Sequence, residues 1–445
     1  MKIVIAGAGE VGTHLAKMLS NENHDIVVID PEEKNLKGID NLDLLTVLGS
    51  ATSFNILKEA DIRRSDLFIA VTHSEDTNIT SAMLGKKLGA KKTIARIDNK
   101  EYLFPSNKEY FESVGIDHLI YPENIAVREL VNLVSQSGTT DFFDFSGGKL
   151  SLFVLKLEEN APLVNKTLLQ TTNGSANLEY RAVAITRNSQ TIIPRGVDTF
   201  KVNDLIYVIS SQAGIKELME FSGKEQIHIK NIMVLGGSRI GIGAANQLEN
   251  KFNVKLVEQN KEKCFKLAGI LNNTLIINGD GRNMELLVDE GLKNMDAFIA
   301  VTGNSETNIL SCLLAKQLGV KRTIAEIENI DYIHIAENMG IDTIVNKKLI
   351  TAGRIFRFTR SAEVSDIKCL TGTDAEVVEF VALSGSKITK GKLSEIDFPK
   401  DSIVGGVIRE DSSFIATGDT QIQENDRVVV FALPKAFAKL EKFFS

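Results

Sequence analysis

Cysteine is scarce in this 445-residue sequence, and its scarcity argues against two classes of protein. The three cysteines, Cys264, Cys312 and Cys369, lie far apart, are odd in number and form no C-x-x-C pair. A disulfide framework and a structural zinc site both need closely spaced sets of cysteines, so neither is predicted. We expect buried thiols in a reducing cytoplasm and no metal site.

Long apolar runs and basic tracts are also missing. No apolar segment approaches the roughly 18 residues of a membrane-spanning helix, and Met1-Lys2 leads straight into a predicted strand, so we expect no signal peptide. The net charge is −7, without a basic tract interleaved with aromatic residues. This pattern argues against binding to nucleic acid or directly to anionic membranes. We expect a cytoplasmic protein whose partners are proteins and nucleotides, and any membrane role must go through a partner.

Catalytic motifs form the third absence. No tyrosine has a lysine four residues later, and no H-E-x-x-H, C-x-x-C, Walker A or G-x-S-x-G pattern occurs. A hydride-transfer enzyme needs a proton-transfer group beside the nicotinamide. We therefore expect no catalytic residues and a protein that is not an enzyme.

The segment KIVIAGAGEVG, from Lys2 to Gly12, combines a short apolar strand, a glycine turn and a helix start. Gly7, Gly9 and Gly12 form G-x-G-x-x-G, in which the first glycine makes the tight turn and the second admits a pyrophosphate close to the backbone. The third lets the helix pack against the strand. The amides at the start of that helix can hold an anion, so the segment predicts a dinucleotide site.

A second apolar strand ends in Asp30, at about the expected distance beyond the glycine motif for an acid that binds a ribose 2′-hydroxyl. Such an acid favours NAD(H) over NADP(H), or an adenosine nucleotide. The alternative is that Asp30 caps a helix that starts with Pro31, Glu32 and Glu33. Both roles can hold together.

Strands and helices alternate onward to Arg96, which predicts a doubly wound parallel sheet. Ligands of such sheets bind outside the carboxyl ends of the strands, which groups Gly49–Thr52, Val71–His73 and Arg96 with the glycine motif. The guanidinium of Arg96 can clamp a pyrophosphate. Alternatively, Arg96 forms a surface ion pair with Glu59 or Asp98.

The whole pattern then repeats, because NIMVLGGSRIG at 231–241 mirrors the opening segment. Asp66–Asn99 aligns with Asp296–Asn329 without a gap, and 20 of the 34 positions are identical. A β-rich segment follows each half, with Asn203-Asp204 and Asn425-Asp426 as matching turn signals. We predict an α/β fold with two Rossmann-like doubly wound parallel-sheet domains, each followed by a small α+β module in the order N1-C1-N2-C2. The predicted ranges are 1–135, 140–222, 228–358 and 363–445.

Over essentially its full length, the chain resembles the tandem RCK proteins, soluble regulators of potassium conductance, and among them the TrkA family of Trk potassium-uptake regulatory subunits. The features that carry the resemblance are the opening segment, Asp30, the AVTHSEDTNI segment, Arg96 and the N-C-N-C order. The resemblance implies a homodimer whose four N domains form a ring under an integral membrane potassium transporter of the Trk type. It also implies that NAD(H) or ATP/ADP binds the first N domain and changes the geometry of this ring.

From the residues and the resemblance together, we predict nucleotide contacts at the strand ends of both halves. In the first half they are Gly7, Gly9, Glu10, Val11, Gly12, Asp30, Pro31, Ser50, Ala51, Thr52, Val71, Thr72, His73 and Arg96. In the second half they are Gly236, Ser238, Arg239, Ile240, Glu258, Gly279, Asp280 and Thr302.

The second half departs from the pattern at two positions. Ser238 replaces the middle glycine, and Glu326 replaces Arg96. Since Arg239 can restore part of the positive charge, we expect weaker or differently selective binding there. Two alternatives stay open, namely an NAD-dependent dehydrogenase, whose glycine motif and Asp30 would be the same, and a purely structural assembly with vestigial glycine turns.

Overall fold

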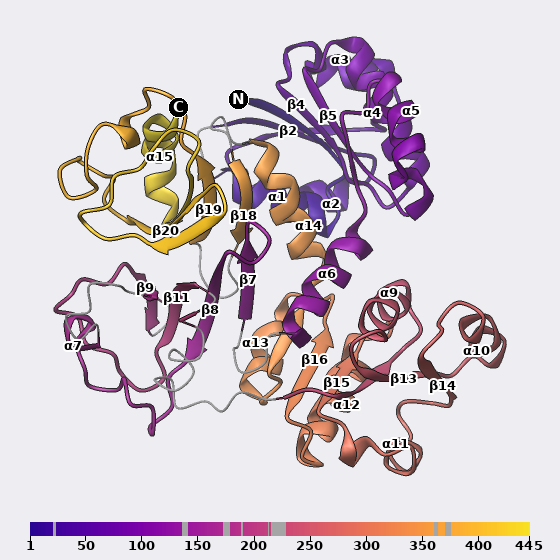
Figure 1. Ribbon diagram of the computed structural model, residues 1–445. Helices are drawn as coiled ribbons and strands as arrows, with labels where there is room; N and C mark the ends of the chain where they lie inside the picture. The colour runs from indigo at the N-terminus through magenta and orange to yellow at the C-terminus, as the bar shows by residue number, and fades with distance from the viewer. Residues whose placement is uncertain are drawn as a thin grey trace. The chain divides into compact units, whose positions relative to one another are not determined.

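The structure is a computed structural model that describes residues 1–20, 24–135, 141–171, 179–187, 190–211, 213–214, 228–359, 364–369 and 375–445 (Figure 1). These residues form two compact units. Unit 1 comprises Met1–Ala126 and Asn346–Thr359, and unit 2 comprises Val127–Val345 and Arg360–Ser445. None of the described helices is long and apolar enough to cross a lipid bilayer.

Unit 1 is built on a six-stranded parallel sheet with the strand order β3-β2-β1-β4-β5-β6. The order reverses between β1 and β4, which is the switch point of a doubly wound fold. The strands are β1 (Lys2–Ala6), β2 (Asp25–Asp30), β3 (Leu45–Leu48), β4 (Leu67–Ala70), β5 (Lys92–Arg96) and β6 (His118–Ile120). The helices are α1 (Glu10–Ser20), α2 (Glu33–Lys37), α3 (Phe54–Glu59), α4 (Glu75–Leu88) and α5 (Pro105–Ser113), with the first turn of α6 (Pro122–Ser135).

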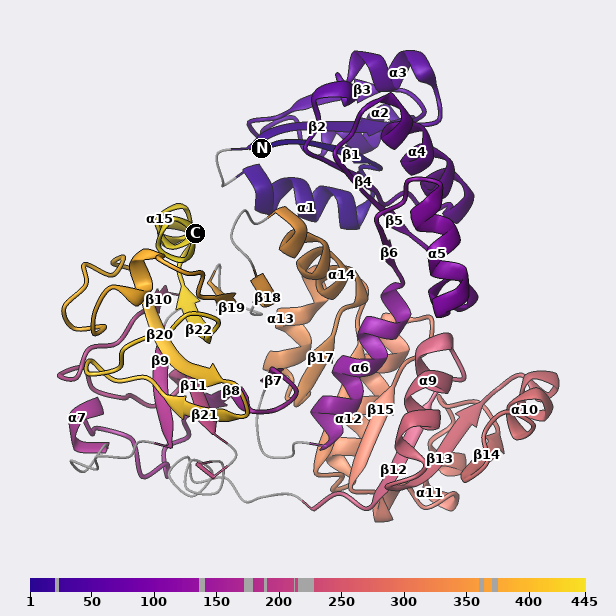
Figure 2. The same cartoon turned by 45° about the horizontal axis from the view of Figure 1, so that its top comes forward.

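Unit 2 contains a second six-stranded parallel sheet with the matching order β14-β13-β12-β15-β16-β17 (Figure 2). The strands are β12 (Asn231–Leu235), β13 (Asn253–Glu258), β14 (Thr274–Asn278), β15 (Ala297–Ala300), β16 (Arg322–Glu326) and β17 (Thr343–Val345). The helices are α9 (Arg239–Leu248), α10 (Lys261–Ala268), α11 (Met284–Asp289), α12 (Ser305–Gln317) and α13 (Asp331–Asn338). The two sheets confirm the predicted duplication.

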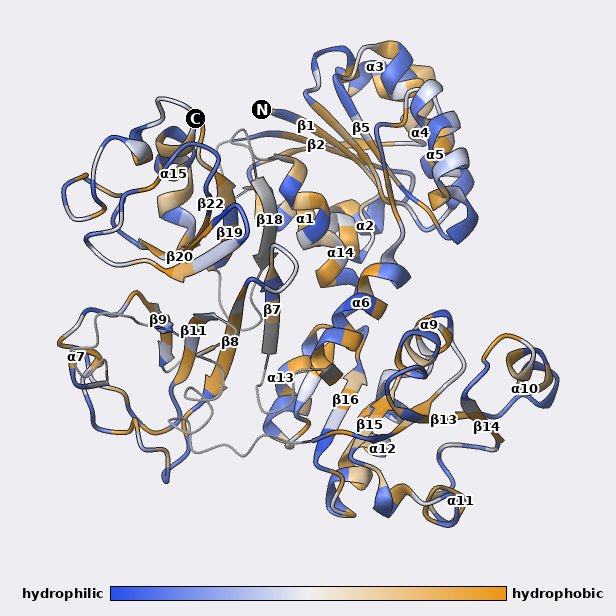
Figure 3. Cartoon of the chain, viewed as in Figure 1, coloured by the Kyte–Doolittle hydropathy of each residue, from blue (hydrophilic) through white to orange (hydrophobic). Residues whose placement is uncertain are grey.

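Apolar strands form the cores of both sheets. Ile3, Val4 and Ile5 of β1 are fully buried, as a parallel strand covered on both faces requires. Figure 3 shows β1 and β2 largely in the hydrophobic colour, whereas the outer surfaces of α3 and α4 carry much blue. Cys264 and Cys312 are buried free thiols, and the side chain of Cys369 lies outside the described residues.

Two five-stranded antiparallel sheets in unit 2 form the small modules and share one apolar core. The first contains β7 (Asp141–Phe145), β8 (Leu150–Lys156), β9 (Tyr180–Arg187), β10 (Gln190–Ile192) and β11 (Leu205–Ser211). The second contains β18 (Val364–Cys369), β19 (Glu376–Val381), β20 (Ser402–Arg409), β21 (Ser412–Ile415) and β22 (Arg427–Ala432), and α15 (Phe437–Phe444) ends the chain. The helix expected over 213–221 lies largely outside the described residues.

The predicted turns before β11 and β22 are confirmed, and each is held by an ion pair. Asn203 and Asn425 both have φ of 66°, a left-handed conformation that asparagine tolerates well. At the first turn, Asp204 lies 2.7 Å from Arg187. At the second turn, Asp426 forms the equivalent ion pair with Arg409, also at 2.7 Å.

Helix α14 (Lys347–Phe356) follows β17 in the sequence but packs against α1 in unit 1, as Figure 1 shows by the orange helix beside the indigo one. Helix α6 does the reverse, because a Cβ atom on Gly243 of α9 would lie 2.7 Å from Val127 of α6. The predicted ranges 1–135 and 228–358 therefore each end in a helix that packs wholly or largely in the other unit. An apolar helix face alone does not tell which of two similar repeats will cover it.

This exchange makes a prediction about Phe356, which is 1% exposed in unit 1 although it belongs to the second half of the sequence. Phe356→Ala is expected to destabilise unit 1 by about 3–5 kcal/mol through the cavity it leaves. Hydrogen exchange followed by mass spectrometry should show faster exchange in peptides from α1. The matched variant Phe298→Ala, in β15, should instead speed exchange in the second parallel sheet. Faster exchange of α9 in Phe356→Ala, with α1 unchanged, would contradict the assignment.

Candidate nucleotide-binding site

The glycine turn between β1 and α1 is the centre of the candidate site. Gly7 has φ of +106°, and a Cβ there would lie 2.9 Å from the Thr72 nitrogen. A Cβ on Gly12 would lie 1.8 Å from the carbonyl oxygen of Gly7. Gly9 differs, because a Cβ on it would meet no atom within 4 Å. Packing of the protein thus demands Gly7 and Gly12, whereas Gly9 faces open space where a ligand can approach the backbone.

The carboxylate of Asp30 lies beneath this turn and is 5% exposed. Its Oδ2 accepts the Ala8 N–H at 2.7 Å, and its Oδ1 accepts the Glu32 N–H at 2.9 Å and Asn35 Nδ2 at 3.0 Å. Helix α2 begins at Glu33 with Glu32 at its N-cap position, so Asp30 precedes the cap. A carboxylate can accept about four hydrogen bonds, so these three leave room for a ribose hydroxyl.

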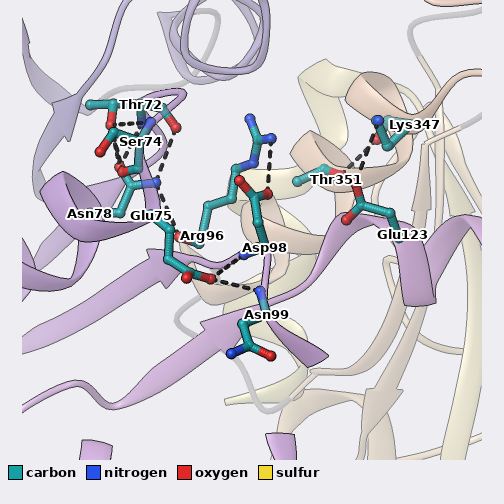
Figure 4. A network of polar contacts seen from close by, with 10 residues as sticks. All are labelled: Thr72, Ser74, Glu75, Asn78, Arg96, Asp98, Asn99, Glu123, Lys347 and Thr351. Carbon is teal, nitrogen blue, oxygen red and sulfur yellow. Dashed lines mark hydrogen bonds and ion pairs between the residues drawn. The ribbon is translucent and has the colours of Figure 1, made fainter. Parts of the chain in front are cut away.

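Asn78 of α4 was not among the predicted site residues, yet it organises the neighbouring strand ends (Figure 4). Its Oδ1 accepts the Thr72 N–H at 2.8 Å, and its Nδ2 donates to the carbonyls of Thr72 at 3.0 Å and Arg96 at 3.1 Å. The side chain is 1% exposed. Asn308 makes the equivalent bonds to Thr302 and Glu326 in the second half. Its place in the repeated TNI segment was the signal that could have identified it.

Arg96 lies at the end of β5 in an ion pair with Asp98, 3.3 Å away, and its side chain is 22% exposed. The predicted alternative of an ion pair with Asp98 is therefore what this structure contains. Glu75 positions Asp98, because its carboxylate accepts the N–H groups of Asp98 and Asn99 (Figure 4). Binding of a phosphate by Arg96 stays a prediction, and it would require the guanidinium to exchange or share this carboxylate.

The other predicted residues of the first half lie at the ends of β2, β3 and β4 and at the start of α1. The N–H of Gly49 donates to the Asp30 carbonyl at 2.9 Å, which places the Ser50–Thr52 loop after β3 beside the end of β2. The hydroxyls of Ser50 and Thr52 are 2.8 Å apart. His73 follows β4 and is exposed, as is Pro31, whereas Val11, Ala51 and Val71 are buried.

The second half differs from the first by a serine in place of Gly9 and by a lysine beside its acid. Ser238 caps α9, with its hydroxyl accepting the Gly241 N–H at 3.2 Å. Glu258 repeats the bond between Asp30 and Ala8, because its Oε2 accepts the Gly237 N–H at 3.1 Å, and Lys263 lies 3.1 Å from the same oxygen. Burial alone would raise the pKa of Glu258, but these bonds and that of the Asn260 N–H more than offset it, and the pKa lies below its usual value.

The remaining predicted residues of the second half occupy the corresponding strand ends. Gly236 has φ of +105°, like Gly7. Asp280, directly after Gly279, lies 2.7 Å from Arg282. Arg239 and the buried Ile240 are the first two residues of α9. The Thr302 N–H donates to Oδ1 of Asn308. Glu326, the acid at the position of Arg96, is 5% exposed and therefore buried. Within the described ranges, no cluster of three or more His, Cys, Asp or Glu could hold a metal ion.

Comparison with known proteins identifies the repeats. The TrkA-N domain matches residues 3–122 and 232–347, and the TrkA-C domain matches residues 152–223 and 377–445. The chain is 34% identical to the Trk system potassium uptake protein TrkA homolog 1 of Methanosarcina mazei, with 100% of both chains aligned. It is 33% identical to the TrkA protein of Haemophilus influenzae, over 100% of this chain and 98% of that one.

Solved structures share the fold at low sequence identity. The GsuK RCK domain has a TM-score of 0.59 and 16% identity, covering 100% of this chain and 94% of its own. The GsuK channel bound to NAD has a TM-score of 0.58 and 16% identity, covering 99% of this chain and 78% of its own. At this identity the likeness establishes the fold alone.

The glycine geometry predicts a separation of stability from binding. Gly9→Ala should leave the midpoint of thermal unfolding of the ligand-free protein nearly unchanged, because its Cβ enters open space. The same change should weaken NADH binding at least tenfold, about 1.4 kcal/mol, since the methyl group lies where a diphosphate would approach. Gly12→Ala should instead lower stability by about 1–3 kcal/mol or more through overpacking against backbone. Unfolding scans and calorimetric titration of both variants test this, and equal stability losses would refute it.

Proposed function

This chain belongs to the TrkA family, and from that premise we propose that it is the nucleotide-sensing regulatory subunit of a membrane potassium-uptake system of the Trk type. The observation that carries the proposal is the full-length alignment with proteins named Trk system potassium uptake protein TrkA, with both N and both C domains in the same order. The partner is an integral potassium transporter, and the subunit is cytoplasmic and reaches the membrane through it.

The first N domain is the principal nucleotide site in this proposal, and its ligand is NAD(H), ATP or ADP. The turn at Gly9 gives a diphosphate access to the amides of α1, which favour an anion. Asp30 has hydrogen-bonding capacity left for a ribose hydroxyl. Arg96 supplies a cation nearby. The GsuK channel, which shares the fold, has been solved bound to NAD and to ADP, which supports the same ligand classes here.

Regulation follows from differential affinity. We propose that the chain is a homodimer whose four N domains form a ring with at least two geometries. A nucleotide shifts the balance between them only to the extent that it binds one geometry more tightly. The transporter partner then responds to the geometry of the ring. A dehydrogenase, the main alternative, would need a proton-transfer group that none of the sequence motifs supplies.

The two sites should differ in affinity. Asp30→Ala is expected to weaken NADH and ATP binding to the stronger site by roughly ten- to a hundredfold, since a hydrogen bond to a charged group contributes about 1.5–3 kcal/mol. Glu258→Ala should leave that stronger site unchanged, because Glu258 ends β13 and belongs to the site of the second half. Isothermal titration of both variants measures this, with unfolding scans to confirm that each is folded. Two indistinguishable sites, each lost with its own acid, would contradict the expected inequality.

Potassium flux tests the regulatory role directly. A reconstituted Trk-type transporter should change its flux on addition of ATP or NADH only when this protein is present, and Asp30→Ala should blunt that response. Flux that is the same with and without the protein at every nucleotide concentration would end the regulatory proposal. In parallel, purified protein should not oxidise NADH with small carbonyl substrates, and steady turnover would favour the dehydrogenase.

A further inference from the structure

The glycine turn of the first site is in contact with a lysine from the far end of the sequence. Lys348, the second residue of α14, has its Nζ 2.5 Å from Oε2 of Glu10. Glu10 is the first residue of α1 and follows Gly9 directly. Both residues belong to unit 1, although they are 338 positions apart in the sequence. The start of α1 thus carries a cation that the first N domain does not encode.

Glu10 is not needed to build the turn. The second half forms the same turn with Arg239 at the corresponding position, and Gly236 and Gly241 repeat the close contacts of Gly7 and Gly12. The side chain of Glu10 is 56% exposed, whereas that of Lys348 is 20% exposed. The acid therefore places a solvent-exposed negative charge at the start of α1, directly after Gly9, and the less exposed lysine pairs with it.

A phosphate at this turn would compete with Glu10 for Lys348. Both anions favour the positive end of α1, and both attract the ammonium group, while they repel each other. The strength of this competition grows with the charge of the ligand, so a triphosphate attracts Lys348 more than the pyrophosphate of a dinucleotide does. The rest of α14 is anchored in unit 1, since Phe358 just after it stacks on His118 with ring centroids 4.2 Å apart. This anchor keeps Lys348 near the turn when it leaves Glu10.

We propose that Lys348 is a phosphate-contacting residue of the first nucleotide site, and that its exchange between Glu10 and the ligand makes this site select nucleotides by phosphate charge. The proposal rests on the proposed function of the first N domain as a nucleotide site. Because Lys348 belongs to α14, its contact would depend on which nucleotide is bound, and α14 comes from the second half of the sequence.

The test compares the two members of the ion pair. Lys348→Met should weaken ATP binding about tenfold and NADH binding about threefold or less. Glu10→Gln should tighten ATP binding about threefold, because it removes the competing anion. The loss in Lys348→Met should shrink as salt rises, since the attraction is electrostatic and partly exposed. Isothermal titration of full-length protein with ATP and with NADH measures all three effects.

A matched variant separates this role from simple packing. Lys347→Met removes the neighbouring positive charge, which lies 3.6 Å from the buried Glu123, and should lower stability without changing the ratio of ATP to NADH affinity. If the ion pair only held α14 in place, Glu10→Gln and Lys348→Met would change binding in the same direction, and the proposal would be refuted. Equal losses of ATP and NADH affinity in Lys348→Met would refute it as well. Absence of nucleotide binding by the wild-type protein would instead overturn the proposed function.

Discussion

The contact between Gly12 and the carbonyl oxygen of Gly7 is the constraint on which the first N domain depends. Any side chain at Gly12 would enter the space of that backbone oxygen, so α1 can lie this close to β1 only because no side chain is present. This approach directs the amides of α1 at the open space beside Gly9, and it places the outer face of α1 where α14 packs. The open turn at Gly9 and the packing of α14 on α1 thus both depend on the close approach of α1 to β1.

The same scaffold serves different purposes in the two halves. Gly236 and Gly241 keep the close approach in the second half, so the turn itself is preserved. The acid after the second strand bonds the turn in both halves, through Asp30 and Ala8 in the first and Glu258 and Gly237 in the second. What changes is that Lys263 pairs with Glu258 and that the Ser238 hydroxyl caps the start of α9, where the first half has only Gly9.

Exchange of terminal helices joins the two halves more closely than the order of domains suggests. Because α14 packs on α1, the residues that surround the first glycine turn include Lys348 from the second half. Helix α14, which carries Lys348, follows β17 in the sequence but belongs to unit 1.

The sequence by itself determined the repeated architecture, the glycine turn, the acid at the end of β2 and the left-handed turns at Asn203 and Asn425. Each of these rests on local chemistry: burial of continuous apolar runs, backbone conformations open to glycine or asparagine, and short spacing along one chain. Tertiary structure decided the rest. The hydrogen bonds of Asn78, the contact of Lys348 with Glu10, the ion pair of Arg96 with Asp98 and the internal pairing of Glu258 depend on groups that lie far apart in sequence or on side-chain conformation. Two repeats with alike helical faces offer α14 alike places to pack, and only the complete set of contacts in space distinguishes them.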